Sequence, residues 1–105
     1  MEIAERRQGD VAVLCPAGRI DNDTSAAFQD KLLATVGTAG ASVVLDLAKV
    51  EYISSAGLRA VLQAARAARL RGGEFAVCAL SDPVRKVFTM SGMHHVLRIY
   101  GELPC

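Results

Sequence analysis

The pattern of apolar and polar positions at the start of the chain indicates a β-hairpin. A weakly amphipathic stretch, Ile3–Gln8, is followed by Gly9-Asp10, a pair typical of tight turns, and then by the apolar run Val11–Ala17. The first arm carries several charged side chains. These suit an edge strand, because charge at an open edge opposes pairing with other chains.

A helix and a buried strand are predicted next. Residues 21–24 are all of types that cap helices, and apolar residues then recur at every fourth position across Phe28–Val36. Gly37 is expected to end this helix. The following run, Val43–Leu47, is apolar on both faces until Asp46, which is typical of a strand in the middle of a sheet covered by helices.

Two further helices and two further strands complete the pattern. Ser54-Ser55 precede a second helix, which has an apolar stripe, arginines on the opposite side and Gly72-Gly73 at its end. A buried strand is predicted over Phe75–Leu80. Ser81–Pro83, a capping pair followed by a first-turn proline, begins a third helix, and Val96–Tyr100 forms the last strand.

The predicted fold is α/β, a single domain over residues 1–105 with the element order β-β-α-β-α-β-α-β. Strands that alternate with helices form a mostly parallel sheet, here with one antiparallel edge strand in front, so the sheet as a whole is mixed. In such sheets, partners and ligands meet the loops that follow the carboxyl ends of the strands. These loops are Gly18–Thr24, Lys49–Ser55 and Leu80–Pro83.

Composition and charge narrow the classes of function. The chain is 51% hydrophobic and 22% charged, as in globular proteins, and its net charge of +1 offers no basic excess for binding nucleic acid. No stretch is long enough to span a membrane, and no signal peptide is predicted. Cys15 and Cys78 lie in apolar runs and are expected to be small buried hydrophobes. We therefore expect a cytoplasmic protein.

Motifs for catalysis and for metal binding are missing around the candidate residues. A serine hydrolase needs a glycine two positions before its nucleophile, and relative to Ser55 that position holds Ile53. His94-His95 have no acidic or cysteine neighbours in the sequence, so no metal site is predicted. A phosphate-binding Gly-Lys-Ser/Thr loop does not occur either. We expect neither catalysis nor a cofactor.

The serine pair Ser54-Ser55 carries the most informative chemistry. One hydroxyl is expected to cap a free backbone N–H of the helix, typically worth about 1 kcal/mol, and a purely structural role for both serines stays open. Two serines exceed the needs of one cap. A second hydroxyl at the helix N-terminus suits phosphorylation, because the helix dipole stabilises an anion there. Asp21 is a candidate helix-start residue, a role that is compatible with contact to a partner, and Asp46 either orients Ser55 or caps a turn.

Segments along the whole chain resemble, in the right order, the STAS family of anti-sigma-factor antagonists. Residues 45–58, LDLAKVEYISSAGL, are similar to the family's signature, a strand and a short passage that end in Asp/Ser-Ser-x-Gly-Leu. Gly18–Asp21, Val77–Ser81 and Phe88–Gly92 are similar to the family as well. The resemblance implies a STAS-like fold.

The resemblance also implies a function based on partner switching. Ser55 corresponds to the phosphorylation site, and Asp21 lies close to it and contributes to kinase binding. The implied partners are an ATP-dependent serine kinase that doubles as an anti-sigma factor, and a metal-dependent serine phosphatase. The unphosphorylated protein, expected to be a monomer when free, binds the kinase, and phosphorylation releases it. The residues expected to border the contact surface are Ser54, Gly57, Leu58 and Met90.

Two positions depart from the family pattern. Many members have Asp where this chain has Ser54, so a carboxylate is missing there. Ser or Thr often stands where this chain has Ala56, which removes one alternative acceptor beside Ser55. The alternative function is a STAS module that binds a small ligand, or scaffolds a complex, without being phosphorylated.

Overall fold

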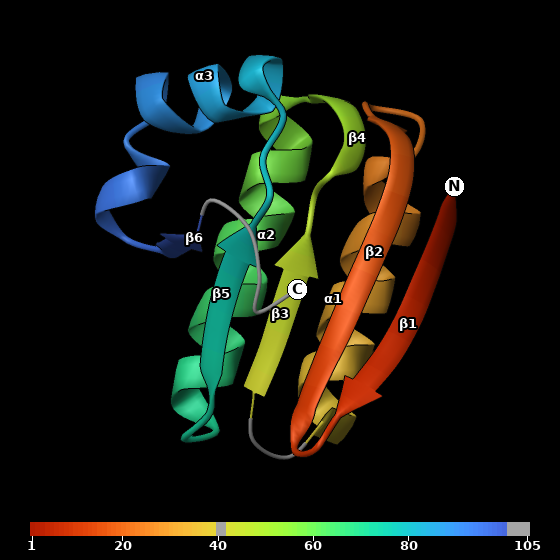
Figure 1. Cartoon of the computed structure of the whole chain (residues 1–105), viewed down its shortest axis with the longest axis vertical. Helices are drawn as coiled ribbons and strands as arrows, with labels where there is room; N and C mark the ends of the chain where they lie inside the picture. Colours follow the sequence, from red (N-terminus) through yellow and green to blue (C-terminus); the bar gives the residue numbers. More distant parts are fainter. Residues whose placement is uncertain (40–41, 101–105) are drawn as a thin grey trace.

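The computed structural model describes residues 1–39 and 42–100, which form a fold of the predicted α/β class (Figure 1). Its strands and helices alternate along the chain almost as the sequence indicates, with one additional strand. The elements, in chain order, are β1 (Glu2–Gln8), β2 (Val11–Ile20), α1 (Ser25–Ala39), β3 (Ser42–Asp46), β4 (Lys49–Ile53), α2 (Ser55–Leu70), β5 (Glu74–Cys78), α3 (Asp82–Met90), the 3-10 helix η1 (Met93–His95) and β6 (Arg98–Tyr100).

The strands form one mixed sheet in the order β1-β2-β3-β5-β6, and β4 pairs with β2 beyond the end of β3. β1 and β2 make the predicted antiparallel hairpin, with Glu2 opposite Ala17 and Gln8 opposite Val11. The other pairings within the described residues are parallel. The prediction of a mostly parallel sheet with one antiparallel edge strand is confirmed.

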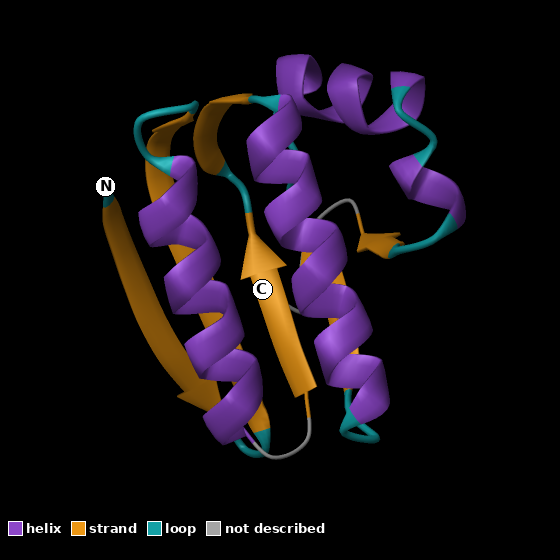
Figure 2. Cartoon of the chain, turned by 180° about the vertical axis from the view of Figure 1, so that it is seen from behind, coloured by secondary structure: helices purple, strands orange, loops and turns teal. Residues whose placement is uncertain are grey.

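α1 and α2 lie side by side over the same face of the sheet (Figure 2). Phe28 and Leu32 of α1 and Val61 of α2 form one buried core with Leu14 and Leu45 of the strands. Removing each of these side chains from water stabilises the fold by about 1.5–3 kcal/mol. This core holds α2, and the serines at its start, against the sheet.

The opposite face of the sheet carries a smaller buried cluster of Val13, Val44 and Cys78. β3 is thus buried on both of its faces, as its apolar run predicts, although α1 and α2 cover only one of them. α3 crosses the end of the sheet at which the parallel strands finish, and it buries Val84 and Phe88 there (Figure 1). The loops at this end are therefore held by packing.

The sequence predicted residues 49–53 as part of a loop, and this is wrong, because they form the strand β4. The carboxylate of Asp46 accepts the N–H of Ala48 at 2.9 Å, and after this turn the chain pairs with the second half of β2. Glu51 is an extra residue opposite the Gly18-Arg19 step of β2. The resulting bulge interrupts the alternation of apolar and polar positions, so the sequence shows no clear strand pattern there.

Several element boundaries also differ from the prediction. β2 continues to Ile20, through three residues predicted as loop, and β5 ends at Cys78 rather than at Leu80. α1 continues past Gly37, which keeps a helical backbone and accepts a hydrogen bond from the Arg71 guanidinium on its carbonyl at 2.9 Å. The last strand is shorter than the predicted Val96–Tyr100. Residues 93–95 turn as η1, and β6 starts only at Arg98.

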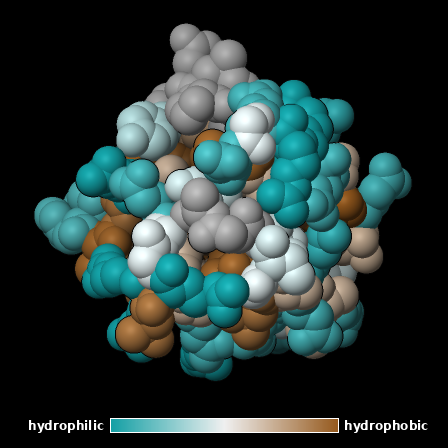
Figure 3. Space-filling model, turned by 90° about the horizontal axis from the view of Figure 1, so that it is seen from below, coloured by the Kyte–Doolittle hydropathy of each residue, from teal (hydrophilic) through white to brown (hydrophobic). Residues whose placement is uncertain are grey.

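The lengths of the helices and the hydropathy of the surface are the two features that would indicate contact with a membrane. Among residues 1–39 and 42–100, none of the helices has both the length and the apolar character that a bilayer crossing requires. Seen from the end that carries the β1–β2 and α2–β5 turns, the surface is mainly hydrophilic (Figure 3). Hydrophobic side chains appear in that view as separate patches rather than as one continuous area.

Candidate functional site

The start of α2 gives the two serines different roles. Ser54 is the N-cap: its hydroxyl oxygen accepts the N–H of Gly57 at 3.2 Å, and the residue is only 9% exposed. Its own N–H donates to the carbonyl of Ile20 at 2.8 Å, which ties the turn to the end of β2. One serine therefore serves as a cap, as the sequence predicts.

Ser55 is the first residue of α2 and is exposed. Its hydroxyl makes no hydrogen bond to any residue that the structure describes. The N–H groups in the first turn of a helix have no acceptor within the helix and create a positive field around that end. The free hydroxyl thus lies in solvent at a place that favours a negative charge.

The pairing of β2 with β4 places Asp21 near the serines. Ile20 is the register partner of Ile53, so the residues that follow them, Asp21 and Ser54, lie at the same end of the sheet. The loop between β5 and α3 joins this end as well, because the hydroxyl of Ser81 donates to a β4 carbonyl at 3.0 Å. The three loops predicted from the sequence therefore meet.

Asp21 is a local turn-forming residue. Its Oδ1 atom accepts the N–H of Asp23 at 3.0 Å and both the N–H and the hydroxyl of Thr24 at 3.2 Å. Partial removal from water raises the pKa of the Asp21 carboxyl, but the N–H groups of Asp23 and Thr24, the Thr24 hydroxyl and the charge of Arg19 together hold this pKa below its ordinary value. The Asp21 carboxylate, in the turn before α1, is therefore ionised at neutral pH.

Asp21→Asn is expected to destabilise the protein at neutral pH more than at low pH. A carboxyl whose pKa is lower in the folded than in the unfolded chain stabilises the fold above the unfolded pKa of about 4, and this stabilisation is lost as the pH falls through the folded pKa. Urea unfolding at pH 7 and at pH 3 measures the difference. Asp23→Asn is the control, because that carboxylate accepts no hydrogen bond among the described residues. A stability deficit that is the same at both pH values would contradict the assignment.

Gly57 allows α2 to approach the sheet closely. A Cβ atom on this residue would lie 2.7 Å from Ile20 Cγ2 and 2.7 Å from Ile53 Cγ1, nearer than carbon atoms pack. The glycine is buried, so it supports the turn from beneath. Ser54 and Gly57 are thus both buried beside Ser55, which is exposed.

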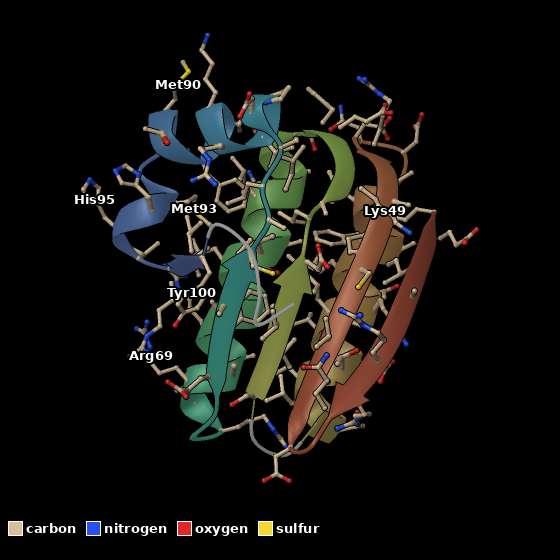
Figure 4. The ribbon with its side chains drawn as sticks, in the orientation of Figure 1. Lys49, Arg69, Met90, Met93, His95 and Tyr100 are labelled. Atoms are coloured by element: carbon tan, nitrogen blue, oxygen red, sulfur yellow. The ribbon has the colours of Figure 1, made fainter. Side chains whose placement is uncertain are left out.

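The remaining predicted contact residues lie apart. Leu58 is half-buried and packs against the core next to Gly57. Met90 is 78% exposed, but it is the last residue of α3, about 12 Å along that helix from its start near β4 (Figure 4). The structure therefore groups Asp21, Ser54, Ser55 and Leu58 near the start of α2 and leaves Met90 at the far end of α3.

The sequence reasoning missed an exposed pair beside Asp21. The guanidinium carbon of Arg19 lies 4.4 Å from the centre of the Tyr52 ring, a cation–π contact between register partners of β2 and β4. Tyr52 is 39% exposed. Only a prediction of β4 together with its bulge would have placed Arg19 and Tyr52 opposite each other.

Asp46 has a structural role rather than a role at Ser55. Besides the Ala48 N–H, its carboxylate accepts a long hydrogen bond of 3.8 Å from the thiol of Cys15. Burial first, and the neighbouring Asp46 charge second, raise the pKa of this thiol. Cys15 is only half-buried, unlike the fully buried Cys78, so the prediction of burial holds for Cys78 alone.

Within residues 1–39 and 42–100, no three His, Cys, Asp or Glu side chains cluster as metal ligands would.

Comparison with known proteins identifies relatives over most of the chain. The family model described as Mlab, STAS domain, matches residues 3–99. BtrV of Bordetella bronchiseptica, named as a candidate anti-sigma factor antagonist, is 40% identical over 80 residues, which cover 76% of this chain and 69% of BtrV.

Several solved structures with the same fold are of anti-sigma factor antagonists. One from Mycobacterium paratuberculosis has a TM-score of 0.89 at 24% identity, covering 97% of this chain and 86% of that chain. SpoIIAA has TM-scores of 0.79 in its unphosphorylated form, at 19% identity, and 0.72 in its phosphorylated form, from Bacillus, at 18% identity. Each alignment with SpoIIAA covers 96% of this chain, and the aligned parts make up 90% and 93% of the two SpoIIAA chains. At these identities, the solved structures support the fold alone.

The family match and the relatives agree with the resemblance noted in residues 45–58. The chain belongs to the STAS domain family, in the group of anti-sigma factor antagonists.

Proposed function

We propose that this STAS domain is an anti-sigma factor antagonist whose partner binding is controlled by phosphorylation of Ser55. The observation that carries the proposal is the division of roles at the start of α2. Ser54 caps the helix, whereas the exposed hydroxyl of Ser55 is free to accept a phosphoryl group. The phosphorylated and unphosphorylated forms of SpoIIAA, which has the same fold, support a covalent switch.

The proposed cycle has two partners. The unphosphorylated protein binds an ATP-dependent serine kinase that also acts as an anti-sigma factor. The kinase transfers the γ-phosphoryl group of ATP to the Ser55 oxygen, which loses its proton, and ADP leaves. A metal-dependent phosphatase then hydrolyses the phosphate ester and regenerates the serine. In this cycle the protein is a cytoplasmic monomer that binds, and it catalyses nothing itself.

Charge accounts for the change in binding. A phosphoserine adds about 1.5 to 2 negative charges at neutral pH. The start of α2 stabilises this charge, so the fold tolerates it. The same surface already carries the Asp21 carboxylate, and a kinase surface that fits the neutral hydroxyl is repelled by the added charge. A few kcal/mol of such repulsion lowers affinity by orders of magnitude.

The test is an intact-mass measurement after incubation with ATP and an anti-sigma factor serine kinase from the same organism. The wild-type chain is expected to gain one phosphoryl group, and Ser55→Ala to gain none. Ser54→Ala is the matched control, because it removes the capping hydroxyl and keeps the acceptor. A chain that gains no mass, but is stabilised against heat by a small ligand, would instead select the alternative of a ligand-binding STAS module.

A further inference from the structure

The charges of this protein are divided unequally along the chain. Residues 55–100 contain seven Lys and Arg side chains and two carboxylates, whereas residues 1–54 contain five Lys and Arg and eight carboxylates. The two halves also lie on different sides of the molecule, with β1, β2 and α1 on one side and α2, β5, α3 and β6 on the other (Figure 1). The small net charge of +1 is therefore the sum of a basic side and an acidic side whose charges nearly cancel.

A cleft opens on the basic side. It has a volume of about 350 Å³ and lies between the second half of α2, the start of β5 and the segment from η1 to β6. Its apolar lining includes Phe75 and Leu97, both less than a tenth exposed. Its cationic lining consists of Arg69 and Arg98, with the imidazole of His95 beside them, and Figure 4 shows Arg69 and His95 along the same side of the molecule.

The cleft exists because the last strand is short. β3 pairs with Glu74 and Phe75 on one side of β5. On the other side β6 pairs only with Ala76, Val77 and Cys78, so the edge of Glu74 and Phe75 that faces away from β3 has no strand beside it in the described chain. An open strand edge of this kind accepts an added extended segment, whose side chains point alternately to opposite sides. One side of such a segment would meet the apolar lining and the other side the cationic groups.

The cationic groups of the cleft are available for an incoming ligand. Arg69 has no ion pair among the described residues. Arg98 lies 3.7 Å from the Glu74 carboxylate, with both side chains about 70% exposed. An exposed pair at this distance is weak, because water screens it. A carboxylate from outside can therefore compete with Glu74 for Arg98.

We propose that this cleft binds an extended acidic segment of a partner protein, in which carboxylates alternate with apolar side chains. Complementary charge and the open edge beside Glu74 and Phe75 favour such a segment. The cleft lies at the other end of α2 from Ser55, about 21 Å along the helix axis. Binding there is independent of the phosphorylation site and of the function proposed for it.

The test uses a fluorescent peptide of alternating Asp and Val as the probe. Anisotropy is expected to show binding that weakens with added salt, and amide NMR signals of residues 73–75 and 95–98 are expected to shift. The double variant Arg69→Ala/Arg98→Ala is expected to weaken binding about tenfold, since it removes two rim charges. Arg66→Ala is the matched control, because Arg66 is exposed on the same helix but does not line the cleft.

Three results would overturn the proposal. Equal loss of affinity in Arg66→Ala would show that only the general basic charge matters, and equal binding of a Lys-Val peptide would exclude charge recognition. Tighter binding of a single-stranded oligonucleotide would identify a different class of ligand. Ser55→Asp and Ser55→Ala are both expected to bind the peptide like the wild type, so failure of the peptide test and failure of phosphorylation are separate outcomes.

Discussion

Ser55→Asp is expected to bind the partner kinase about a hundredfold more weakly than the wild type, equivalent to ~2.7 kcal/mol. The substitution adds a permanent negative charge at an exposed position at the same end of the sheet as the Asp21 carboxylate. In the proposed cycle this surface receives the kinase only when Ser55 is neutral. Ser55→Ala keeps the surface neutral and is expected to bind like the unmodified protein. Because it has no acceptor oxygen, ATP is not expected to release it.

Calorimetric titration of the kinase with each variant measures both effects, with and without ATP. Gln8→Asp is the charge control, because it adds the same charge at the exposed end of β1, next to the β1–β2 turn. If Ser55→Ala and Ser55→Asp bind the kinase equally, charge at Ser55 does not control the interaction. The alternative function without phosphorylation would then gain support.

Gly57→Ala is expected to lower the free energy of unfolding by about 1–3 kcal/mol, the usual cost of adding a methyl group where there is no space. The new Cβ would meet the side chains of Ile20 and Ile53 at 2.7 Å, so the start of α2 has to move away from the sheet. This cost exceeds the helix-propensity gain of up to ~1 kcal/mol that alanine brings over glycine. Because Ser55 is two residues earlier, we also expect slower phosphorylation.

The matched control for Gly57→Ala is Gly37→Ala. Gly37 also lies inside a helix, but a Cβ atom there meets nothing within 4 Å. Its replacement is expected to stabilise the protein by about 0.5–1 kcal/mol, through helix propensity alone. Urea unfolding of both variants measures the difference. The proposed role of Gly57 fails if both substitutions change stability in the same direction and by the same amount.

Much of the fold was predictable because helix and strand periodicity is a local property. The hairpin around Gly9-Asp10, the helix over Phe28–Val36 and the buried run Val43–Leu47 each contain enough repeats to show their period. The strand β4 does not. Its five residues include a bulge at Glu51, so its strand character appears only in its pairing with β2.

The sequence by itself determined the α/β class, the charged edge strand and the presence of two serines at the start of a helix, because these follow from neighbouring residues. Only the tertiary structure decided which serine is free. The inward hydroxyl of Ser54 caps Gly57, which leaves that of Ser55 in solvent. It also brought Asp21 to the serines through the β2–β4 register, and gathered Arg69, His95 and Arg98 around one cleft. Such contacts join residues far apart in the chain, and periodicity holds no information about them.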